Sequence, residues 1–441
     1  MPIIQPSRFN LYLGGIQEDR FVLYNTLSTN VRILNKAAKV VLQTADLAVL
    51  PQEIIDDLVA GRFLVSSNTD ELELYREERD RHRYDTHELS VVALTNYKCN
   101  LACTYCYVPS LNLPMRAELD NPMSDATARQ LVRFTAMRAT HQHANSISVD
   151  FVGLGEPLLH PSPLRIIMKG LREFSSSSHI LVSFNIVTNG VLLIHNLDLL
   201  SNDVGVQVTL DGPQEYHNRV RKYANGNGTF DIIMSSINMI KQTAARCSVR
   251  IHVDRDNGDS VPRLLTELKS RFGSDPLLKI VPRLPGSDIS CDWSQSCLTQ
   301  GELTKMLALW EMALDMGFRL QFGPLLNVLN CAAMSDSTFV CDPRGLLYKC
   351  EGLAGNPTYC IGNIREGVKR EGAYEEWMQI DQLKSSECQQ CTLLPTCGGW
   401  CPHLERYYRG SFLQACCTKN KELLLGALKL QLKKMLPELP L

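Results

Sequence analysis

The chain has 441 residues and a formal net charge of −2, with 45 lysine and arginine residues against 47 aspartate and glutamate residues. This length predicts two or three domains with a full-sized core. The balanced charge, with no long basic run, argues against nucleic acid as a partner. No apolar run approaches the roughly 20 residues of a membrane span, and the opening segment MPIIQPSRFNLYLGG lacks the pattern of a signal peptide. We therefore expect a cytoplasmic protein without membrane contact.

Residues 1–87 are predicted to form a small α+β module. Strand-like runs at 8–15, 20–28 and 62–67 surround two helical patterns at 33–45 and 51–61. A highly charged segment at 71–86 is predicted to be a solvated helical connector, because its charges alternate in sign at helical spacing.

Residues 88–285 alternate between strands and helices. Strands are predicted at 88–95, 146–153, 179–188, 204–211, 248–254 and 277–284. Helices are predicted at 125–140, 162–174, near 195–200, 229–245 and 261–272. Repeated β–α units indicate an α/β fold with a parallel sheet. Six units are too few for a complete eight-fold barrel, so we expect a partial, TIM-like (β/α)6 barrel.

The remaining chain divides into a bridge and a cysteine-rich end. The bridge, 286–330, contains one amphipathic helical pattern at 303–317. Residues 331–441 are predicted to be rich in loops and to close with a helix over 421–439, which we expect to pack against the protein.

Polar and glycine-rich stretches follow the predicted strands in turn: NYKC after the first, GLGEP after the second, then TNG, DGP and DRDN. In parallel α/β folds the chemistry lies at the carboxyl ends of the strands. Pattern and motif placement therefore predict one site at this edge of the sheet.

Sixteen cysteines are unusual for a protein expected in a reducing compartment, where disulfides are rare. They are also clustered, with three between 99 and 106 and ten between 331 and 417, which argues for metal binding. The first group, Cys99, Cys103 and Cys106, has the spacing C-x3-C-x2-C. Structural zinc sites use four ligands. Iron–sulfur cubes also normally use four thiolates, so three would leave one iron open to an exchangeable ligand.

This spacing after a first strand, with Tyr105 directly before the last cysteine, resembles the radical S-adenosylmethionine superfamily. The resemblance implies a [4Fe-4S] cluster on the three cysteines, whose open iron binds S-adenosylmethionine. Reductive cleavage then yields a 5′-deoxyadenosyl radical that abstracts hydrogen from a substrate, with the cofactor supplying the hard chemistry. A zinc site short of one ligand is the alternative.

Further motifs resemble those of the same family. FVGLGEPLL is similar to its Gly-Gly-Glu-Pro motif, although Leu154 replaces the first glycine, and VTLDGPQEYHNRVR is similar to its Ser-Leu-Asp-Gly-Pro segment, with Thr209 in place of serine. His252 stands where asparagine is common. Ser183 and Asn189 are predicted contacts of the methionine carboxylate or the ribose. The cofactor-binding residues that the resemblance implies are Tyr105, Gly153, Gly155, Glu156, Pro157, Ser183, Asn189, Asp211 and Arg221, with His217 matching a further family position.

The second cysteine group is similar in spacing to the SPASM domain of peptide- and protein-modifying radical enzymes. The resemblance implies two auxiliary [4Fe-4S] clusters, and hence three clusters in all. The first would use Cys331, Cys341, Cys350 and Cys401. The second would use Cys388, Cys391, Cys397 and Cys417, with Cys416 as the alternative. Some relatives leave the position of Cys341 open for substrate. A pair of zinc knuckles is the other interpretation of these spacings.

The resemblance implies a peptide or protein substrate with a leader, and an electron donor such as flavodoxin or ferredoxin. Expected products are a thioether, a carbon–carbon crosslink or an oxidised side chain. Glu351 stands where an aspartate base stands in the sulfatase-maturing branch, so it is a candidate base. Residues 1–87 are candidates for binding the leader by strand addition. Formylglycine formation, modification of a dehydrogenase subunit and a zinc-stabilised, non-catalytic peptide-binding scaffold remain alternatives.

Overall fold

The computed structural model describes residues 3–17, 20–44, 47–106, 108, 121–275, 277–282, 298, 302–322, 325–399, 401–403, 406, 410 and 421–435. The chain forms two compact units, each assembled from segments distant in sequence. Unit 1 comprises Met1–Tyr84, Phe322–Ala332 and Ile380–Leu441, and unit 2 comprises Asp85–Gln321 and Ala333–Gln379.

Unit 2 is built on one large sheet with the strand order β11-β10-β9-β8-β7-β6-β12-β13-β14-β15. The six predicted strands pair in parallel and in sequence order, which confirms the expected α/β fold of the partial-barrel type. The strands are β6 (Glu88–Ala93), β7 (Ser146–Phe151), β8 (Leu181–Thr188), β9 (Val204–Thr209), β10 (Arg246–Val253), β11 (Leu277–Pro282), β12 (Thr338–Cys341), β13 (Leu346–Tyr348), β14 (Gly362–Asn363) and β15 (Gly367–Val368).

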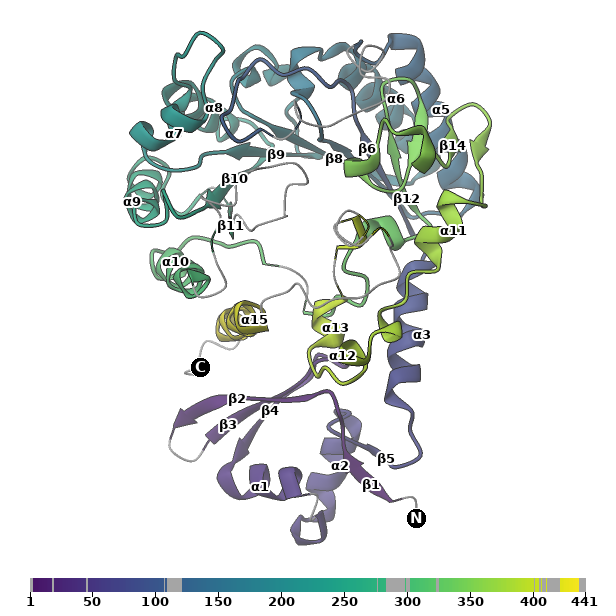
Figure 1. The fold of residues 1–441 in the computed structure, drawn as a ribbon, viewed down its shortest axis with the longest axis vertical. Coiled ribbons are helices and arrows are strands. Elements are labelled where there is room, and N and C mark those ends of the chain that lie inside the picture. The colour runs from purple at the N-terminus through teal and green to yellow at the C-terminus, as the bar shows by residue number, and fades with distance from the viewer. Residues whose placement is uncertain are drawn as a thin grey trace. The chain divides into compact units, whose positions relative to one another are not determined.

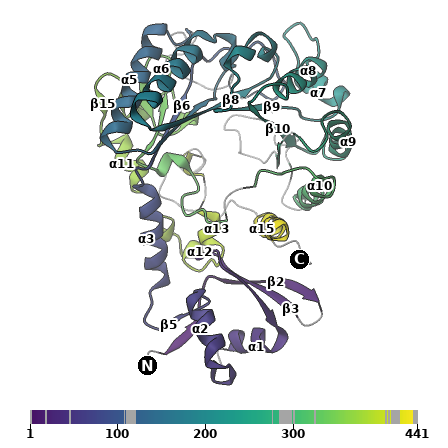
Figure 2. The ribbon, with the colours of Figure 1, turned by 180° about the vertical axis from the view of Figure 1, so that it is seen from behind.

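Helices cover the outer face of this sheet (Figures 1 and 2). They include α5 (Asp125–His141), α6 (Ser162–Ser178), α8 (Phe230–Ile240) and α9 (Val261–Phe272), and unit 2 also contains α7 (Gln214–Val220), α10 (Thr304–Asp315) and α11 (Ala373–Met378). Alternate strand residues such as Val149, Ile186 and Ile251 are fully buried. Residues between them, such as Asp150, Asn185 and Arg250, are only half-buried. Because successive side chains point to opposite faces of a strand, the second set lies on the inner face.

The structure differs from the sequence prediction in several places. The helix expected near 195–200 is a pair of short 3-10 turns, Leu193–His195 and Leu197–Leu199. The seven-residue helix α7 was not predicted, since it is too short to show a clear periodicity. The region after 331 contains strands as well as loops, and β12 pairs in parallel with β6, adding a seventh parallel strand.

Unit 1 contains the N-terminal sheet β2 (Asn10–Gln17), β3 (Arg20–Asn25) and β4 (Val31–Asn35). It also contains β1 (Ile4–Pro6), β5 (Leu64–Ser66), α1 (Lys36–Thr44), α2 (Gln52–Ala60), α3 (Glu71–Arg83), α12 (Ser386–Gln389), α13 (Leu394–Cys397) and α15 (Lys421–Met435). The helix predicted to start at residue 33 begins at Lys36 instead, because Ile33 and Leu34 pair with β3.

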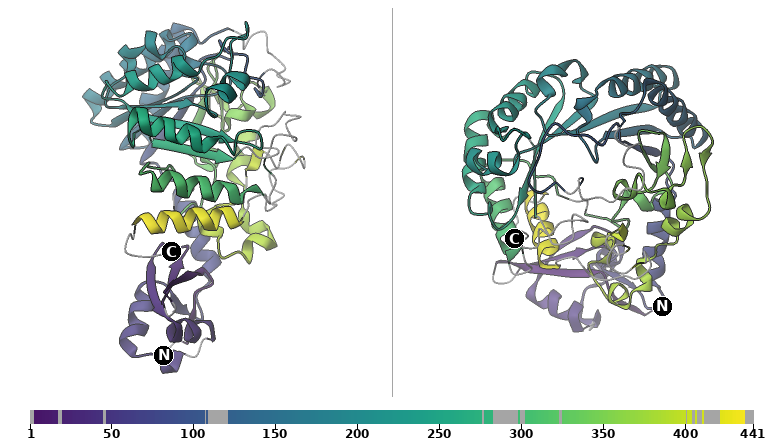
Figure 3. Two further views of the ribbon diagram at one scale, coloured as in Figure 1. Left: turned by 90° about the vertical axis from the view of Figure 1, so that its left-hand side faces the viewer. Right: turned by 45° about the horizontal axis from the view of Figure 1, so that its top comes forward.

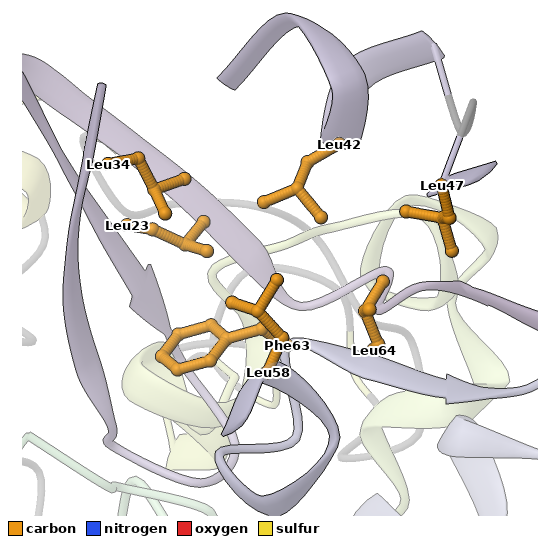
Figure 4. Close-up of a cluster of buried hydrophobic side chains, with 7 residues drawn as sticks. All are labelled: Leu23, Leu34, Leu42, Leu47, Leu58, Phe63 and Leu64. Atoms are coloured by element: carbon orange, nitrogen blue, oxygen red, sulfur yellow. The ribbon is translucent and has the colours of Figure 1, made fainter. Parts of the chain in front are cut away.

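Both faces of the N-terminal sheet are covered within unit 1. Leucine side chains of β3 and β4 pack with those of α1 and α2 around Phe63 (Figure 4). Leu428 and Leu432 of α15 pack against Leu13 and Val22 on β2 and β3, and the helix runs along the sheet in Figure 3. The C-terminal helix is therefore a packing element, as its apolar spacing predicted. No described helix combines the length and the apolar character needed to cross a membrane.

Candidate functional site

The three-cysteine loop follows β6 and is held by backbone hydrogen bonds to the last residue of α7 and to the segment after it. The N–H of Ala102 donates to the carbonyl of Lys222 at 2.8 Å, and the N–H of Thr104 donates to that of Val220 at 2.9 Å. Cys99 and Cys106 are exposed, and Cys103 is half-buried. A short turn brings Cys106 back to Cys103, whose carbonyl accepts the Cys106 N–H at 3.1 Å. The loop therefore presents its thiols from an anchored backbone.

Two glycines allow the loop after β7 to pack closely on the loop after β6. A Cβ atom on Gly155 would lie 2.6 Å from the Lys98 carbonyl oxygen and 2.7 Å from that of Asn96. Gly153 has a φ of +128°, which favours glycine, and a Cβ there would lie 2.1 Å from Leu94 Cδ2. The motif GLGEP thus sets the distance between the cysteine loop and the second strand.

Glu156 is 2 % exposed, and its carboxylate points into the protein. It accepts hydrogen bonds from Thr188 Oγ1 at 2.6 Å, from the N–H of Asn189 at 2.7 Å and from the N–H of Leu158 at 3.0 Å. Burial raises the pKa of this carboxyl, while these donors counteract part of the shift. Glu156 therefore joins the carboxyl ends of β7 and β8, and Pro157 is buried at the start of the following turn.

Asn189, at the end of β8, reaches the cysteine loop. Its Nδ2 donates to Asn100 Oδ1 at 2.8 Å and lies 3.7 Å from Cys99 Sγ. Ser183 lies five positions before the last residue of the same strand, which at about 3.3 Å per residue places it roughly 17 Å from that end. The structure therefore brings Asn189 to the site but does not bring Ser183 there.

Asp211, fully buried after β9, is the centre of a polar network. The Tyr105 hydroxyl donates to its carboxylate and accepts from Arg221. Arg221 Nη1 lies 3.7 Å from Asp211 Oδ2, and His252 Nδ1 lies 3.0 Å from Asp211 Oδ1. Asn257, which sequence analysis did not single out, donates to the Asp211 carbonyl. This network ties the cysteine loop to the ends of β9 and β10 and assembles three of the predicted residues.

Arg221 supplies a positive charge next to the cysteine loop. Burial alone would lower the pKa of its guanidinium. The nearby Tyr105, Cys103 and Asp211 raise this pKa by more than burial lowers it, so the net shift is upward. Its buried Nε has no hydrogen-bond partner among the described residues. Burial raises the pKa of the Cys103 thiol, and the Arg221 cation offsets part of this shift.

This donor set fits an iron–sulfur cluster. Three thiols share one anchored loop, with a cation beside Cys103 and an amide N–H directed at Cys99. Within the described part of the chain, no three histidine, cysteine, aspartate or glutamate side chains are grouped closely enough for one metal ion. A cubane cluster does not require such a group, since each thiolate binds a different iron.

His217 is buried beneath this network. Its Nδ1 accepts a hydrogen bond from the Asp211 N–H at 3.3 Å, and its Nε2 lies 3.1 Å from Thr229 Oγ1. The Thr229 hydroxyl donates to the Arg221 carbonyl, so Nε2 is the protonated nitrogen of a neutral ring. Burial, followed by the nearby Arg221, lowers the pKa of His217 to about 3.

We expect His217→Gln to flatten the pH dependence of stability. Between pH 6.5 and pH 3 the unfolded state binds a proton on His217 that the folded state does not, so stability falls as the pH falls. From pH 7.0 to pH 5.5 this costs about 1 kcal/mol. Urea unfolding at both values should show that the wild type loses about this much more stability than the variant. Equal losses of stability in the wild type and the variant would contradict the conclusion that His217 stays neutral in the folded protein.

In unit 1, three predicted cluster ligands lie around one tyrosine of α3. Cys388 and Cys391 pack in the same apolar cluster as Tyr75, and the thiols of Cys397 and Cys388 are close enough to raise the pKa of its phenol, which burial already raises strongly. The N–H of Cys391 donates to the Cys388 carbonyl at 3.1 Å. The structure thus brings together three of the four cysteines predicted for the second auxiliary cluster. Cys416 and Cys417 lie outside the described residues.

The cysteines predicted for the first auxiliary cluster belong to different units. Cys341 ends β12 and is fully buried, and Cys350 follows β13 in the same hairpin. Cys331 and Cys401 belong to unit 1. This ligand set therefore stays a prediction.

A group of charged residues on the inner face of the sheet was not predicted from the sequence: Asp150, Arg250 and Lys279, with Gln207 beside them. Each of these residues stands in a strand that is rich in apolar and β-branched residues, as in SISVDF, SVRIHV and LLKIVP. Because side chains alternate between the two faces of a strand, each occupies a position that points to the inner face. That signal was present in the sequence. Glu351, the candidate base, is exposed and near enough to Arg250 for each to influence the other's pKa.

Residues 94–268 match the model of the Radical SAM superfamily. The chain is 25% identical over 328 residues to a serine-type anaerobic sulfatase-maturating enzyme of Klebsiella aerogenes, covering 69% of this chain and 77% of that protein. It is 24% identical over 326 residues to a cysteine-type anaerobic sulfatase-maturating enzyme of Clostridium perfringens (strain 13 / Type A), covering 69% and 85%.

Two groups of solved structures share the fold. Native anSMEcpe with bound AdoMet superposes with a TM-score of 0.61 at 18% identity, over 79% of this chain and 99% of that one. Streptococcus suis SuiB bound to its precursor peptide SuiA superposes with a TM-score of 0.55 at 13% identity, over 94% and 99%. At these identities the likeness concerns the fold, and the SuiB match extends over nearly the whole chain.

Proposed function

Since residues 94–268 form a radical SAM domain and the chain is a radical SAM enzyme, we propose that it is a maturase that modifies a ribosomally made peptide or a protein. The observation that carries this proposal is the junction of Cys103, Arg221, Asp211 and Tyr105 at the carboxyl edge of the sheet. The second cysteine group around Tyr75 and the fold shared with a peptide-bound enzyme support a peptide substrate.

Cys99, Cys103 and Cys106 would hold the catalytic [4Fe-4S] cluster. With S-adenosylmethionine bound, that cluster supplies one-electron cleavage and hydrogen-atom abstraction. The chain's own residues would hold and orient this cluster. Arg221 balances the negative charge that three thiolates bring, and Asn189 donates toward the Cys99 sulfur. Tyr105 and Asp211 fix the loop against β9 and β10, so that the cluster site keeps a constant position over the inner face.

The finer parts of the proposal concern the other cofactors and partners. Two auxiliary [4Fe-4S] clusters on the C-terminal cysteines would accept the electron left after hydrogen abstraction or anchor the substrate. A flavodoxin or ferredoxin would supply electrons to the catalytic cluster. A leader peptide would add to the N-terminal sheet at β4, which is an edge strand of that sheet. In this scheme Glu351 takes the substrate proton.

Formylglycine formation is the second candidate function. It is favoured by the sequence likeness to sulfatase-maturating enzymes over 69% of the chain. The non-catalytic zinc scaffold is not retained, because the radical SAM domain and these relatives identify an enzyme.

The test is to incubate the reconstituted chain with S-adenosylmethionine, a strong reductant and either peptides translated from short reading frames beside its gene or a sulfatase segment. A crosslink removes two hydrogen atoms from the peptide for each deoxyadenosine formed and leaves no aldehyde. Formylglycine instead gives an aldehyde that a hydrazide captures. Deoxyadenosine without a change in either substrate would contradict the maturase proposal.

A further inference from the structure

Two cations lie side by side on the inner face of the sheet in unit 2. Arg250 of β10 and Lys279 of β11 are direct partners in the parallel register. Their neighbours Val249, Ile251 and Leu278 are fully buried on the helix-covered face. Because strands are about 4.8 Å apart and register partners point to the same face, both side chains rise together from the inner face.

No described carboxylate forms an ion pair with either cation. Among the described residues, Lys279 makes no hydrogen bond or ion pair. In the described part of the chain, the one side-chain hydrogen-bond partner of Arg250 is the Gln207 amide oxygen, 3.2 Å from its Nε in the amide orientation that satisfies both groups. Burial lowers the pKa of Lys279, and the neighbouring Arg250 lowers it further. A half-buried ammonium without an acceptor costs free energy that a bound anion would recover.

Two carboxylates balance this charge from a distance. Asp150 of β7 lies beside Asn185, its register partner on β8. Glu351 lies after β13 and acts on Arg250 electrostatically without an ion pair. The cations sit on adjacent strands in register, so one carboxylate could contact both. The two carboxylates are near enough for the charge of Asp150 to raise the pKa of Glu351, but they come from β7 and from the segment after β13, which are not register partners.

The cation pair is close to the reacting edge of the sheet. His252, which bonds to Asp211, is the next inward residue after Arg250 on β10. The charges of Asp211 and Arg221 also act on Arg250. A group held by the pair would therefore lie next to the place where the modified residue must be.

We propose that Arg250 and Lys279 bind a carboxylate of the peptide substrate adjacent to the residue that is modified. The carboxylate would come from an aspartate or glutamate side chain or from the peptide's C-terminus. This inference rests on the proposed function and narrows its substrate class. It gives the enzyme a preference for acidic peptides that is separate from any leader binding.

The test uses pools of random decapeptides, one with free and one with amidated C-termini, captured on immobilised reconstituted enzyme with S-adenosylmethionine and then sequenced. In the wild type we expect acidic residues to be enriched about tenfold or more over asparagine and glutamine, the scale of a hydrogen bond between charged groups. In the double variant R250Q/K279M the enrichment should fall to about the level of the amides. Enrichment in the free-acid pool alone would assign the carboxylate to the C-terminus.

Two further variants serve as controls for a loss of the acidic preference that is caused by misfolding. Arg246→Gln removes an exposed cation from the start of the same strand and should retain the acidic preference. Lys279→Arg keeps the charge and should also retain it. No acidic preference in the wild type, or a preference for lysine and arginine, would overturn the inference.

Deoxyadenosine formation without peptide is measured in parallel. Its absence in the wild type would refute the proposed function itself, whatever the peptide pools show. If R250Q/K279M loses deoxyadenosine formation but keeps the acidic preference, the cations serve S-adenosylmethionine and the inference is overturned.

Discussion

Replacing Cys99, Cys103 and Cys106 together with alanine should abolish deoxyadenosine formation and lower the iron content by about four per chain, the content of one cubane cluster. The three thiols are the donor set of one loop, which β6 and the segment after α7 hold in place. The cysteines around Tyr75 belong to the other unit, so their iron should remain. Iron and sulfide analysis together with a deoxyadenosine assay measures both effects.

Cys247→Ala is the matched control for this triple variant. Cys247 lies on β10 outside the spaced groups, and burial raises the pKa of its thiol to about 12, as expected for an inert cysteine. It should keep both its iron and its turnover. Unchanged deoxyadenosine formation in the triple variant would contradict the proposal that these three cysteines hold the catalytic cluster.

A single methyl group on Gly155 should be almost as damaging. In Gly155→Ala the new Cβ would lie 2.6 to 2.8 Å from three backbone atoms of residues 96–98, directly before Cys99. Backbone cannot rotate away as a side chain can, so the cysteine loop must shift by a large fraction of an ångström. Misplacement of this size costs on the order of a hundredfold in rate. We expect a comparable loss of deoxyadenosine formation, with lower iron occupancy after reconstitution.

Gly14→Ala provides the comparison, because a Cβ at Gly14 meets no atom within 4 Å. It should leave deoxyadenosine formation and iron content unchanged. If Gly155→Ala were as active as Gly14→Ala, the close approach of the two loops would not matter for the cluster site.

The repeated β–α pattern was readable from the sequence because each strand is a short apolar run and each helix has its own periodicity. The motifs at the strand ends were readable for the same reason, since Asp211 and Asn189 directly follow β9 and β8. Parallel pairing then collects these ends at one edge, whatever lies between them.

Other features depend on contacts between residues far apart in the sequence. The pairing of β12 with β6 joins residues 338–341 to 90–93, and nothing local predicts it. The carboxylate of Glu156 faces Thr188, because the Thr188 hydroxyl and the Asn189 N–H at the end of β8, together with the Leu158 N–H in the turn after β7, compensate its burial. Ser183 lies near the beginning of β8, so its position along the strand keeps it away from the carboxyl end where the site forms.

We expect this radical SAM enzyme to carry auxiliary clusters on its C-terminal cysteines for work on a peptide. The most direct test is the iron, sulfide and zinc content per chain after anaerobic reconstitution. The account predicts about twelve irons and as many sulfides, the content of three four-iron clusters, with no zinc. About four irons together with zinc would contradict it, because the cysteines around Tyr75 would then be structural.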